Sequence, residues 1–293
     1  MSGTRSRTAR WIAHIPLLLL SIACIAPIAL MVSISLSSGE RIAATGYSFW
    51  PQDINLEAYE YVFMASERIF RAYGVSLFVT ITGTFLSLLV MSMIAYPLSR
   101  RDYIHRGKLM FYVVFTMLFH GGLVPTYIVI SNYLQMKDTL WVLILPYLAA
   151  PWFIIMLRTY FSQLSHEIIE AATVDGCSEK RILFTLIIPM SKPALATIGL
   201  LTVLRYWNDW FLGLLYIDST NLYPLQLLLY VMMANIQELL RTALDTGIVE
   251  IADFPSEAAR MAMALVVAGP MLLVFPFFQK YFVKGLADGA VKG

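Results

Sequence analysis

Six apolar segments, each long enough to cross a bilayer as a helix, constrain this chain more than any other feature. They cover residues 12–36, 72–98, 109–131, 139–161, 194–217 and 261–283. A helix needs about 20 such residues to cross roughly 30 Å of hydrocarbon. The chain is also only 14% charged, whereas soluble domains have about 25% charged residues. We therefore predict an all-α integral membrane protein with six transmembrane helices, organised as a single domain over residues 1–293.

A seventh apolar stretch, residues 223–236, is shorter than a span requires and contains Gln226. We expect an interfacial or re-entrant helix there rather than another span. The surrounding segment, residues 218–260, is long enough to fold as a lid over a pore mouth. Another outer loop, residues 37–71, is rich in aromatic residues. That pattern is typical of a belt at the headgroup level, and the alternative is a docking surface for an external protein.

The charged residues test this topology independently, because lysine and arginine accumulate in cytoplasmic loops. The segments predicted to lie inside hold 14 cations and six acids, whereas those predicted to lie outside hold six cations and twelve acids. This partition places both the N-terminus and the C-terminus in the cytoplasm. The basic leader before the first span is also found in secretory signals. We nevertheless expect an anchor, because the apolar core is longer than a signal needs and no clear cleavage site follows it.

Residue patterns for enzymatic chemistry are absent from the sequence. The four histidines have no metal-ligand spacing, and Cys24 and Cys177 are predicted at different membrane depths, so we expect two unpaired thiols. The chain contains neither a Walker A loop nor a nucleophile elbow. We therefore predict no catalytic residue, no metal site and no cofactor bound by this chain. If the chain moves a solute uphill, another protein must supply the energy.

The loop between the fourth and fifth predicted spans, residues 162–193, carries the most informative pattern. The residues before Gly176 can form two helical turns with Ile168, Ala171 and Ala172 on one side. Gly176 can then end this helix in the left-handed conformation, which is costly for other residues.

A second helix is predicted after this glycine, with Ser178 as its N-cap and Pro189 at the point where it stops or bends. The loop is thus predicted to form a helix–glycine–helix elbow on the cytoplasmic side. An ordinary connection between two spans is one interpretation. The small alanines favour the other, a knuckle that inserts closely into a partner protein.

A polar group lies deep within the fifth predicted span, at Arg205, Trp207, Asn208 and Asp209. Ionisable groups at this depth cost at least a few kcal/mol each, so they should face the protein interior or a water-filled cavity. Arg205 and Asp209 are four residues apart and can pair on one helical face, which would be a structural role. Alternatively the group lines a solute path, because an indole and an amide suit a sugar ring and its hydroxyls. Both interpretations remain open.

Several motifs resemble those of a known family. Glu170-Ala171-Ala172, Asp175-Gly176 and Pro189 match, in order and spacing, the EAA loop of permeases from ATP-binding-cassette importers. The likeness covers nearly the whole chain and is greatest for carbohydrate permeases of the maltose-transporter class, within a branch that handles complex or acidic oligosaccharides. Further similar segments are Gly121–Tyr127, Trp207-Asn208 and Phe275–Gly285. Cys177 stands where alanine is usual and Leu183 where an aromatic residue is common, which affects packing detail only.

The resemblance implies roles for particular residues. In the EAA loop, Glu170, Ala171, Ala172, Asp175 and Gly176 would be the coupling residues that seat in a cleft of the ATPase. For the substrate path the resemblance supports Trp207 and Asn208, because this class carries a similar Trp-Asn step in a helix that lines the sugar pathway. Arg205 and Asp209 are candidates for the same path because of their depth in the span.

The resemblance also implies an assembly in the bacterial cytoplasmic membrane. Its members would be a second homologous permease that forms a heterodimer with this chain, two copies of a cytosolic ATPase that bind ATP and magnesium, and an extracytoplasmic sugar-binding protein. The substrate would be an oligosaccharide, for example a uronate-containing fragment of alginate or pectin, moved by alternating access. No nucleic acid is expected as a partner.

Three rival classes explain the sequence less well. A secondary transporter would show internal repeats and membrane acids for ion coupling, whereas Asp209 is the one acid within a predicted span. A membrane enzyme would need a catalytic constellation. A passive channel gives no reason for the elbow.

Overall fold

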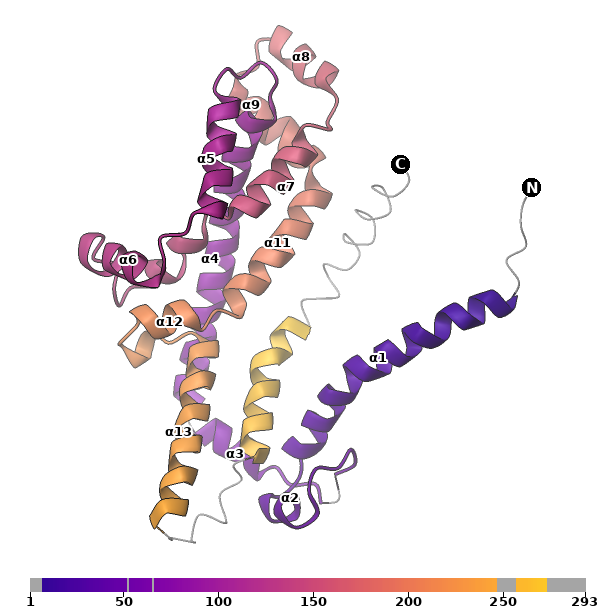
Figure 1. The fold of residues 1–293 in the computed structure, drawn as a ribbon, viewed down its shortest axis with the longest axis vertical. Helices are drawn as coiled ribbons and strands as arrows, with labels where there is room; N and C mark the ends of the chain where they lie inside the picture. The colour runs from indigo at the N-terminus through magenta and orange to yellow at the C-terminus, as the bar shows by residue number, and fades with distance from the viewer. Residues whose placement is uncertain (1–6, 52, 65, 247–256, 273–293) are drawn as a thin grey trace. The chain divides into compact units, whose positions relative to one another are not determined.

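The structure, a computed structural model, describes residues 7–51, 53–64, 66–246 and 257–272. These residues form helices and loops with no strand among them, so the predicted all-α fold is confirmed for this part of the chain (Figure 1). The chain divides into two compact units, residues 1–67 with 229–269 and residues 68–228 with 270–293. The single domain over residues 1–293 stays a prediction.

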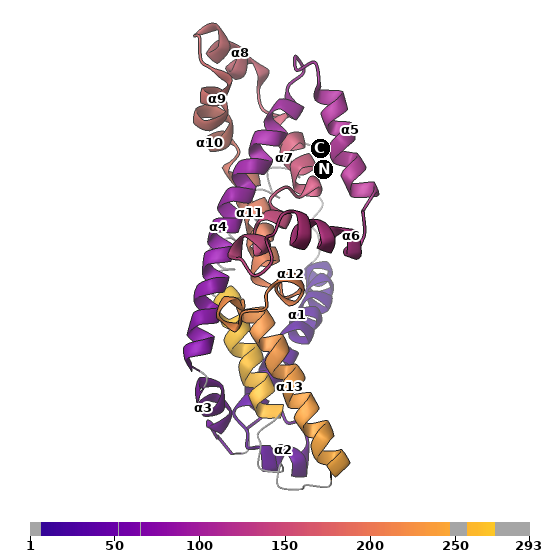
Figure 2. The same ribbon diagram turned by 90° about the vertical axis from the view of Figure 1, so that its left-hand side faces the viewer.

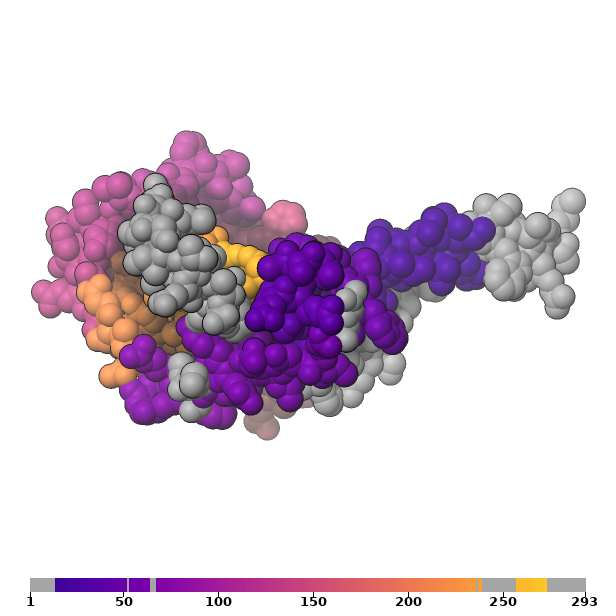
Figure 3. Space-filling view, turned by 90° about the horizontal axis from the view of Figure 1, so that it is seen from below, coloured from indigo at the N-terminus to yellow at the C-terminus, as the bar shows by residue number. Residues whose placement is uncertain are grey.

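The first unit begins with α1 (Arg7–Ser35), which includes the first predicted span. Residues 14–35 of this helix are apolar and long enough to cross a membrane. Most of the apolar side chains that the structure describes here are exposed in the single chain, and the indigo spheres of α1 in Figure 3 lie largely uncovered. An apolar helix with so little cover requires lipid or another apolar protein surface around it.

The predicted outer loop, residues 37–71, contains two short helices, α2 (Gly39–Thr45) and α3 (Glu57–Met64). The backbone N–H of Asn55 donates to the carbonyl of Leu36 at 2.8 Å, which fixes the loop against the end of α1. Phe49 and Trp50 are exposed. Whether these aromatic residues form a headgroup belt or a docking surface stays a prediction.

The second predicted span is one continuous helix, α4 (Ser66–Ser99). It has 34 residues and begins beside Glu67, an acid that suits the positive end of a helix. In Figures 1 and 2, α4 runs through its unit beside α11 (Lys192–Trp207). It is therefore the long element on which the rest of this unit packs.

The third predicted span, residues 109–131, is broken rather than continuous. Its first part is α5 (Arg106–Leu118), and the chain then bends by 113° into α6 (Leu123–Ile128) and the π-helical turn η1 (Val129–Tyr133). Gly122 takes a positive φ of 88° at this bend, and its N–H donates to Nδ1 of His120 at 3.0 Å. Helix α5 thus ends at Leu118, and the left-handed Gly122 precedes α6, where apolarity alone predicted a straight helix.

The fourth and fifth predicted spans, residues 139–161 and 194–217, are also interrupted. The fourth begins with two short 3-10 helices, η2 (Leu140–Leu143) and η3 (Leu145–Tyr147), and continues as α7 (Pro151–Phe161). The chain bends by 49° before α7, because Pro151 cannot continue the preceding hydrogen-bond ladder. In the fifth, α11 stops at Trp207, and α12 (Phe211–Tyr216) follows after a short break.

Two of the described helices are long and apolar enough to cross a membrane, and counting each bent pair as one span raises the number to five. The sixth predicted span, residues 261–283, is helical over 261–272, and the rest of it lies outside the described residues. Six spans therefore stay a prediction. The stretch at residues 223–236 overlaps the start of α13 (Leu225–Thr246), a helix longer than expected whose residues Leu225–Asn235 are apolar but too few for a span.

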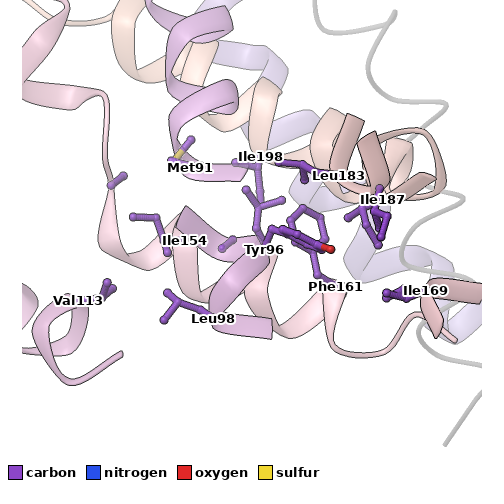
Figure 4. Packing of buried hydrophobic residues seen from close by; sticks show 14 of the residues in the cluster. Met91, Tyr96, Leu98, Val113, Ile154, Phe161, Ile169, Leu183, Ile187 and Ile198 are labelled. Atoms are coloured by element: carbon purple, nitrogen blue, oxygen red, sulfur yellow. The ribbon is translucent and has the colours of Figure 1, made fainter. Parts of the chain in front are cut away.

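Two hydrophobic clusters hold the second unit together. One gathers side chains of α4, α5, α7 and α11 with the loop that follows α7, and includes Tyr96, Phe161, Ile169 and Leu183 (Figure 4). The other surrounds Tyr206 of α11. The first cluster anchors the predicted elbow, and the second anchors the polar group of the fifth predicted span.

Candidate functional site

The predicted elbow has the local structure that its sequence indicates. Its first helix is α8 (His166–Val174), and Gly176 follows with a φ of 79°. The N–H of Cys177 donates to the carbonyl of Ala172, and that of Gly176 donates to the carbonyl of Thr173, both at 3.0 Å. These two bonds form a Schellman end, which needs the left-handed conformation at the glycine. The predicted helix end at Gly176 is confirmed.

The second arm of the elbow runs from Glu179 to Met190, as expected from Ser178 and Pro189, but it is not a regular α-helix throughout. It comprises α9 (Glu179–Ile182), the π-helical turn η4 (Leu183–Ile187) and α10 (Ile188–Met190), after which the chain bends by 83° into α11. Ser178 has the extended backbone of an N-cap, but its side chain makes no capping hydrogen bond. The bend follows Pro189, in agreement with the predicted role of that residue.

The exposed face of α8 differs from the predicted one. Ile169 and Ala172 are 5% and 8% exposed and pack into the first hydrophobic cluster, because residues three apart share a helix face. Ala171 is exposed and Val174 is 86% exposed. The prediction that Ile168, Ala171 and Ala172 share one face is therefore wrong for Ala172. Glu170, Ala171, Asp175 and Gly176 are the predicted coupling residues that face outward.

A polar cluster that the sequence did not indicate joins the elbow to α4. The hydroxyl of Tyr96 donates to Oε2 of Glu179 at 2.5 Å, and Nη2 of Arg100 lies 3.6 Å from Oε1 of the same carboxylate. Arg100 also forms a two-bond pair with Asp102, at 2.9 and 2.7 Å. This pair lowers the pKa of Asp102 and raises that of Arg100. Tyr96 and Glu179 are 83 residues apart, so no local pattern could reveal the contact.

The group at the end of α11 does not contain the predicted ion pair. No ion pair joins Arg205 and Asp209, both of which the structure describes. Tyr147 lies between them instead: its ring centroid is 3.9 Å from the guanidinium carbon of Arg205, and its hydroxyl donates to Oδ1 of Asp209 at 3.1 Å. The helix ends at Trp207, so Asp209 is no longer one turn beyond Arg205 on the same face.

The neighbouring residues have distinct structural contacts. Trp207 is 2% exposed, and its ring centroid lies 6.3 Å from that of Tyr73. Asn208 is exposed, donates from Nδ2 to the carbonyl of Leu204 at 2.8 Å, and accepts a hydrogen bond from Gln226 at 3.3 Å. Of the four predicted path residues, Arg205 and Asn208 face outward, Trp207 is buried, and Asp209 is half-buried.

Tyr206 fixes this end of α11 against α4. Its hydroxyl bonds to Oγ of Ser87 at 2.9 Å and donates to the carbonyl of Ile144 at 3.0 Å. A Cβ on Gly83 would lie 2.6 Å from Cζ of Tyr206, so the ring requires a glycine at that position. A glycine within an apolar helix was the one sequence signal for this close approach.

Two loops are joined on the segments that were predicted to lie outside. Oδ1 of Asp138 accepts from the N–H groups of Asp218 and Ser219 at 3.1 and 2.9 Å, and Lys137 pairs with Asp218 at 2.9 Å. Asp138 has a positive φ of 59°, which aspartate tolerates better than most residues. The hydrogen bonds from Ser219 hold the pKa of Asp138 below its usual value.

The described residues contain no group of three or more His, Cys, Asp or Glu side chains placed to hold a metal ion.

Comparison with known proteins places this geometry in context. The model of the family described as "binding-protein-dependent transport system inner membrane component" matches residues 62–288. The polygalacturonan/rhamnogalacturonan transport system permease protein YtcP of Bacillus subtilis is 36% identical over 279 residues, which cover 94% of this chain and 96% of that protein. Protein LplC of the same organism is 37% identical, over 92% of this chain and 90% of LplC.

A solved structure is similar as well. It is a bacterial ABC transporter involved in the import of the acidic polysaccharide alginate, and one of its chains matches with a TM-score of 0.81 and 28% identity. The match covers 96% of this chain and 100% of the chain in the solved structure. Both the fold and the sequence are therefore shared over nearly the full length.

Proposed function

Because the chain belongs to the family of binding-protein-dependent transport system inner membrane components, it is a permease subunit of an ATP-binding-cassette sugar importer, and we propose that it carries an acidic oligosaccharide. It is a transport subunit and not an enzyme. The observation that carries the proposal is the 36% identity, over 94% of this chain, to a permease named for polygalacturonan and rhamnogalacturonan. The likeness to an importer of alginate, another acidic polysaccharide, supports it independently.

We propose a topology of six spans in the bacterial cytoplasmic membrane, with both termini in the cytoplasm. The family is one of inner-membrane components, and the partition of lysine and arginine supports this orientation. In it the elbow faces the cytoplasm, and the Asp138–Ser219 contact lies on the outer side.

The elbow is proposed to be the coupling element. Glu170, Ala171, Asp175 and Gly176 face outward and would contact a cytosolic ATPase. Ala172 would serve a different purpose, because its burial holds α8 on the hydrophobic cluster. A small exposed alanine at position 171 lets another protein approach closely.

The proposed assembly contains this chain, a second homologous permease, two ATPase subunits that bind ATP and magnesium, and an extracytoplasmic binding protein. The family's dependence on a binding protein supports the last of these partners. The exposed apolar side chains of α1 and α5 favour lipid and a second membrane subunit as neighbours. Alternating access would then follow from rocking of the spans as the ATPases open and close.

Arg205 and Asn208 are the proposed solute contacts in this subunit, because both face outward at the end of α11. A guanidinium binds a carboxylate by two parallel hydrogen bonds, which suits a uronate. Trp207 and Asp209 would support the path by holding α11 and α12 in place. Their burial and contacts with Tyr73 and Tyr147 favour this division.

The test is ATP hydrolysis and uptake by the assembled importer in proteoliposomes, with its binding protein presenting oligogalacturonates, alginate oligomers or neutral maltooligosaccharides. An acidic oligosaccharide should stimulate hydrolysis and accumulate inside the vesicles. Equal stimulation by neutral sugars would contradict the proposed substrate class, and accumulation without ATP would contradict the importer mechanism.

A further inference from the structure

The contact between Glu179 and α4 links two elements that the proposed mechanism must move together. Glu179 is the first residue of α9, whereas Tyr96 lies in the last turn of α4 and Arg100 directly follows that helix. One carboxylate oxygen accepts from the Tyr96 hydroxyl at 2.5 Å, and the other lies 3.6 Å from the Arg100 guanidinium. Both oxygens are therefore directed at the same end of α4.

Burial of the three side chains is unequal. Tyr96 is 6% exposed. It belongs to the first hydrophobic cluster, whose members Phe161, Ile169 and Leu183 are labelled with it in Figure 4. The Arg100 side chain is also largely covered, whereas that of Glu179 is 59% exposed. The α4 side of the contact is thus fixed by packing, while the elbow side lies at the surface. An apolar contact can slide, but hydrogen bonds to a carboxylate are directional and hold one geometry.

The same helix reaches the proposed solute contacts. Gly83 and Ser87 of α4 contact Tyr206, which is adjacent to Arg205 on α11. A displacement of the end of α4 would therefore also displace Tyr206, because rigid helices and packed side chains transmit the movement.

We propose that Glu179 is a positioning residue: through Tyr96 and Arg100 it makes α4 move with the elbow, and so couples the ATPase to the solute path. This inference rests on the proposed coupling function of the elbow. Without the contact the elbow would still bind the ATPase, but its movement would reach α4 only through apolar packing.

The experiment measures sugar imported per ATP hydrolysed by the complete importer in proteoliposomes. In Tyr96→Phe and Glu179→Ala, import per ATP should fall about tenfold, the factor that one charge-assisted hydrogen bond supplies, while hydrolysis continues. Glu179→Gln keeps an oxygen acceptor for Tyr96 and should recover part of the loss. The double variant Tyr96→Phe with Glu179→Ala should be no worse than Glu179→Ala alone, because both changes remove one contact.

Tyr160→Phe is the matched control, because Tyr160 packs against the same cluster and the change again removes only a hydroxyl. Import per ATP in this variant should be normal. Normal import per ATP in both Tyr96→Phe and Glu179→Ala would overturn the inference. Loss of assembled complex in both would also overturn it, because the contact would then serve folding rather than coupling.

Ala171→Arg separates this inference from the proposed function on which it rests. A long side chain at this exposed position should prevent the ATPase from docking and abolish uptake. If Ala171→Arg transports normally, the coupling function of the elbow is wrong. If Ala171→Arg is inactive while the Tyr96 and Glu179 variants are normal, only the inference about Glu179 fails.

Discussion

The guanidinium carbon of Arg205 lies 3.9 Å from the ring centroid of Tyr147, and the hydroxyl of that ring donates to Asp209. A cation over an aromatic face gains about 0.5–1 kcal/mol at an exposed site, which holds Arg205 in place. Asp209 is bonded to the tyrosine instead of forming an ion pair with Arg205. The guanidinium of Arg205 is thus held in place without a direct ion pair to Asp209, and under the proposed function it would contact an anionic sugar.

Arg205→Ala should therefore affect uptake of an acidic oligosaccharide more than uptake of a neutral one. A hydrogen bond to a charged group contributes about 1.5–3 kcal/mol, so uptake efficiency for the acidic sugar should fall roughly ten- to a hundredfold. Initial uptake rates at several sugar concentrations measure this. Arg205→Lys is the control that keeps the charge, and an equal loss for both classes of sugar would exclude a role in charge recognition.

Gly176→Val should abolish transport while the permease still inserts in the membrane. The φ of 79° at Gly176 is costly for a residue with a Cβ, by about 1–2 kcal/mol, and more so when that residue is β-branched. The elbow would be redirected although open space surrounds this glycine. Uptake and membrane content are measured together; normal uptake would contradict the coupling role, and loss of inserted protein would indicate a folding role.

Gly83→Ala should destabilise the protein by about 1–3 kcal/mol, the range for overpacking a close contact. The new Cβ would lie 2.6 Å from Cζ of Tyr206, and the two hydrogen bonds of that hydroxyl restrict its retreat. Thermal unfolding of the detergent-purified chain measures the change. Gly74→Ala is a matched control in the same helix with nothing within 4 Å of its Cβ, and it should be neutral or slightly stabilising.

Stability should also depend on pH through Asp138, whose pKa is lowered by hydrogen bonds from Ser219. A depressed pKa contributes stability above the unfolded value of about 3.9 and loses it as pH falls through the lower folded value. Ser219→Ala should therefore unfold at a lower temperature than the parent at pH 6. The difference should shrink as pH drops below about 3.9; a difference that does not depend on pH would contradict the assignment.

The topology predicts which cysteines react in intact cells with a permeabilised outer membrane. In a background without Cys24 and Cys177, a cysteine at residue 105 or at the C-terminus should resist a membrane-impermeant maleimide. A cysteine at residue 245 should be labelled. Detergent lysis, which should expose all three positions, is the control, and labelling of all three in intact cells would overturn the six-span topology.

Much of the elbow was predictable because its structure is local. The helix before Gly176, the left-handed glycine and the bend after Pro189 each depend on a few consecutive residues and on backbone sterics. Burial was less predictable: Ile169 and Ala172 pack inward into the first hydrophobic cluster, and the periodicity of one short helix does not specify which of its faces is covered.

The amino-acid sequence by itself determined that the chain belongs in a membrane, because apolar length and the scarcity of charge do not depend on tertiary contacts. It also determined the family motif and the turn at Gly176. Only the tertiary structure decided that Tyr147 separates Arg205 from Asp209 and that Tyr96 meets Glu179. Those features join residues tens of positions apart, and their geometry comes from how whole helices pack rather than from any local preference.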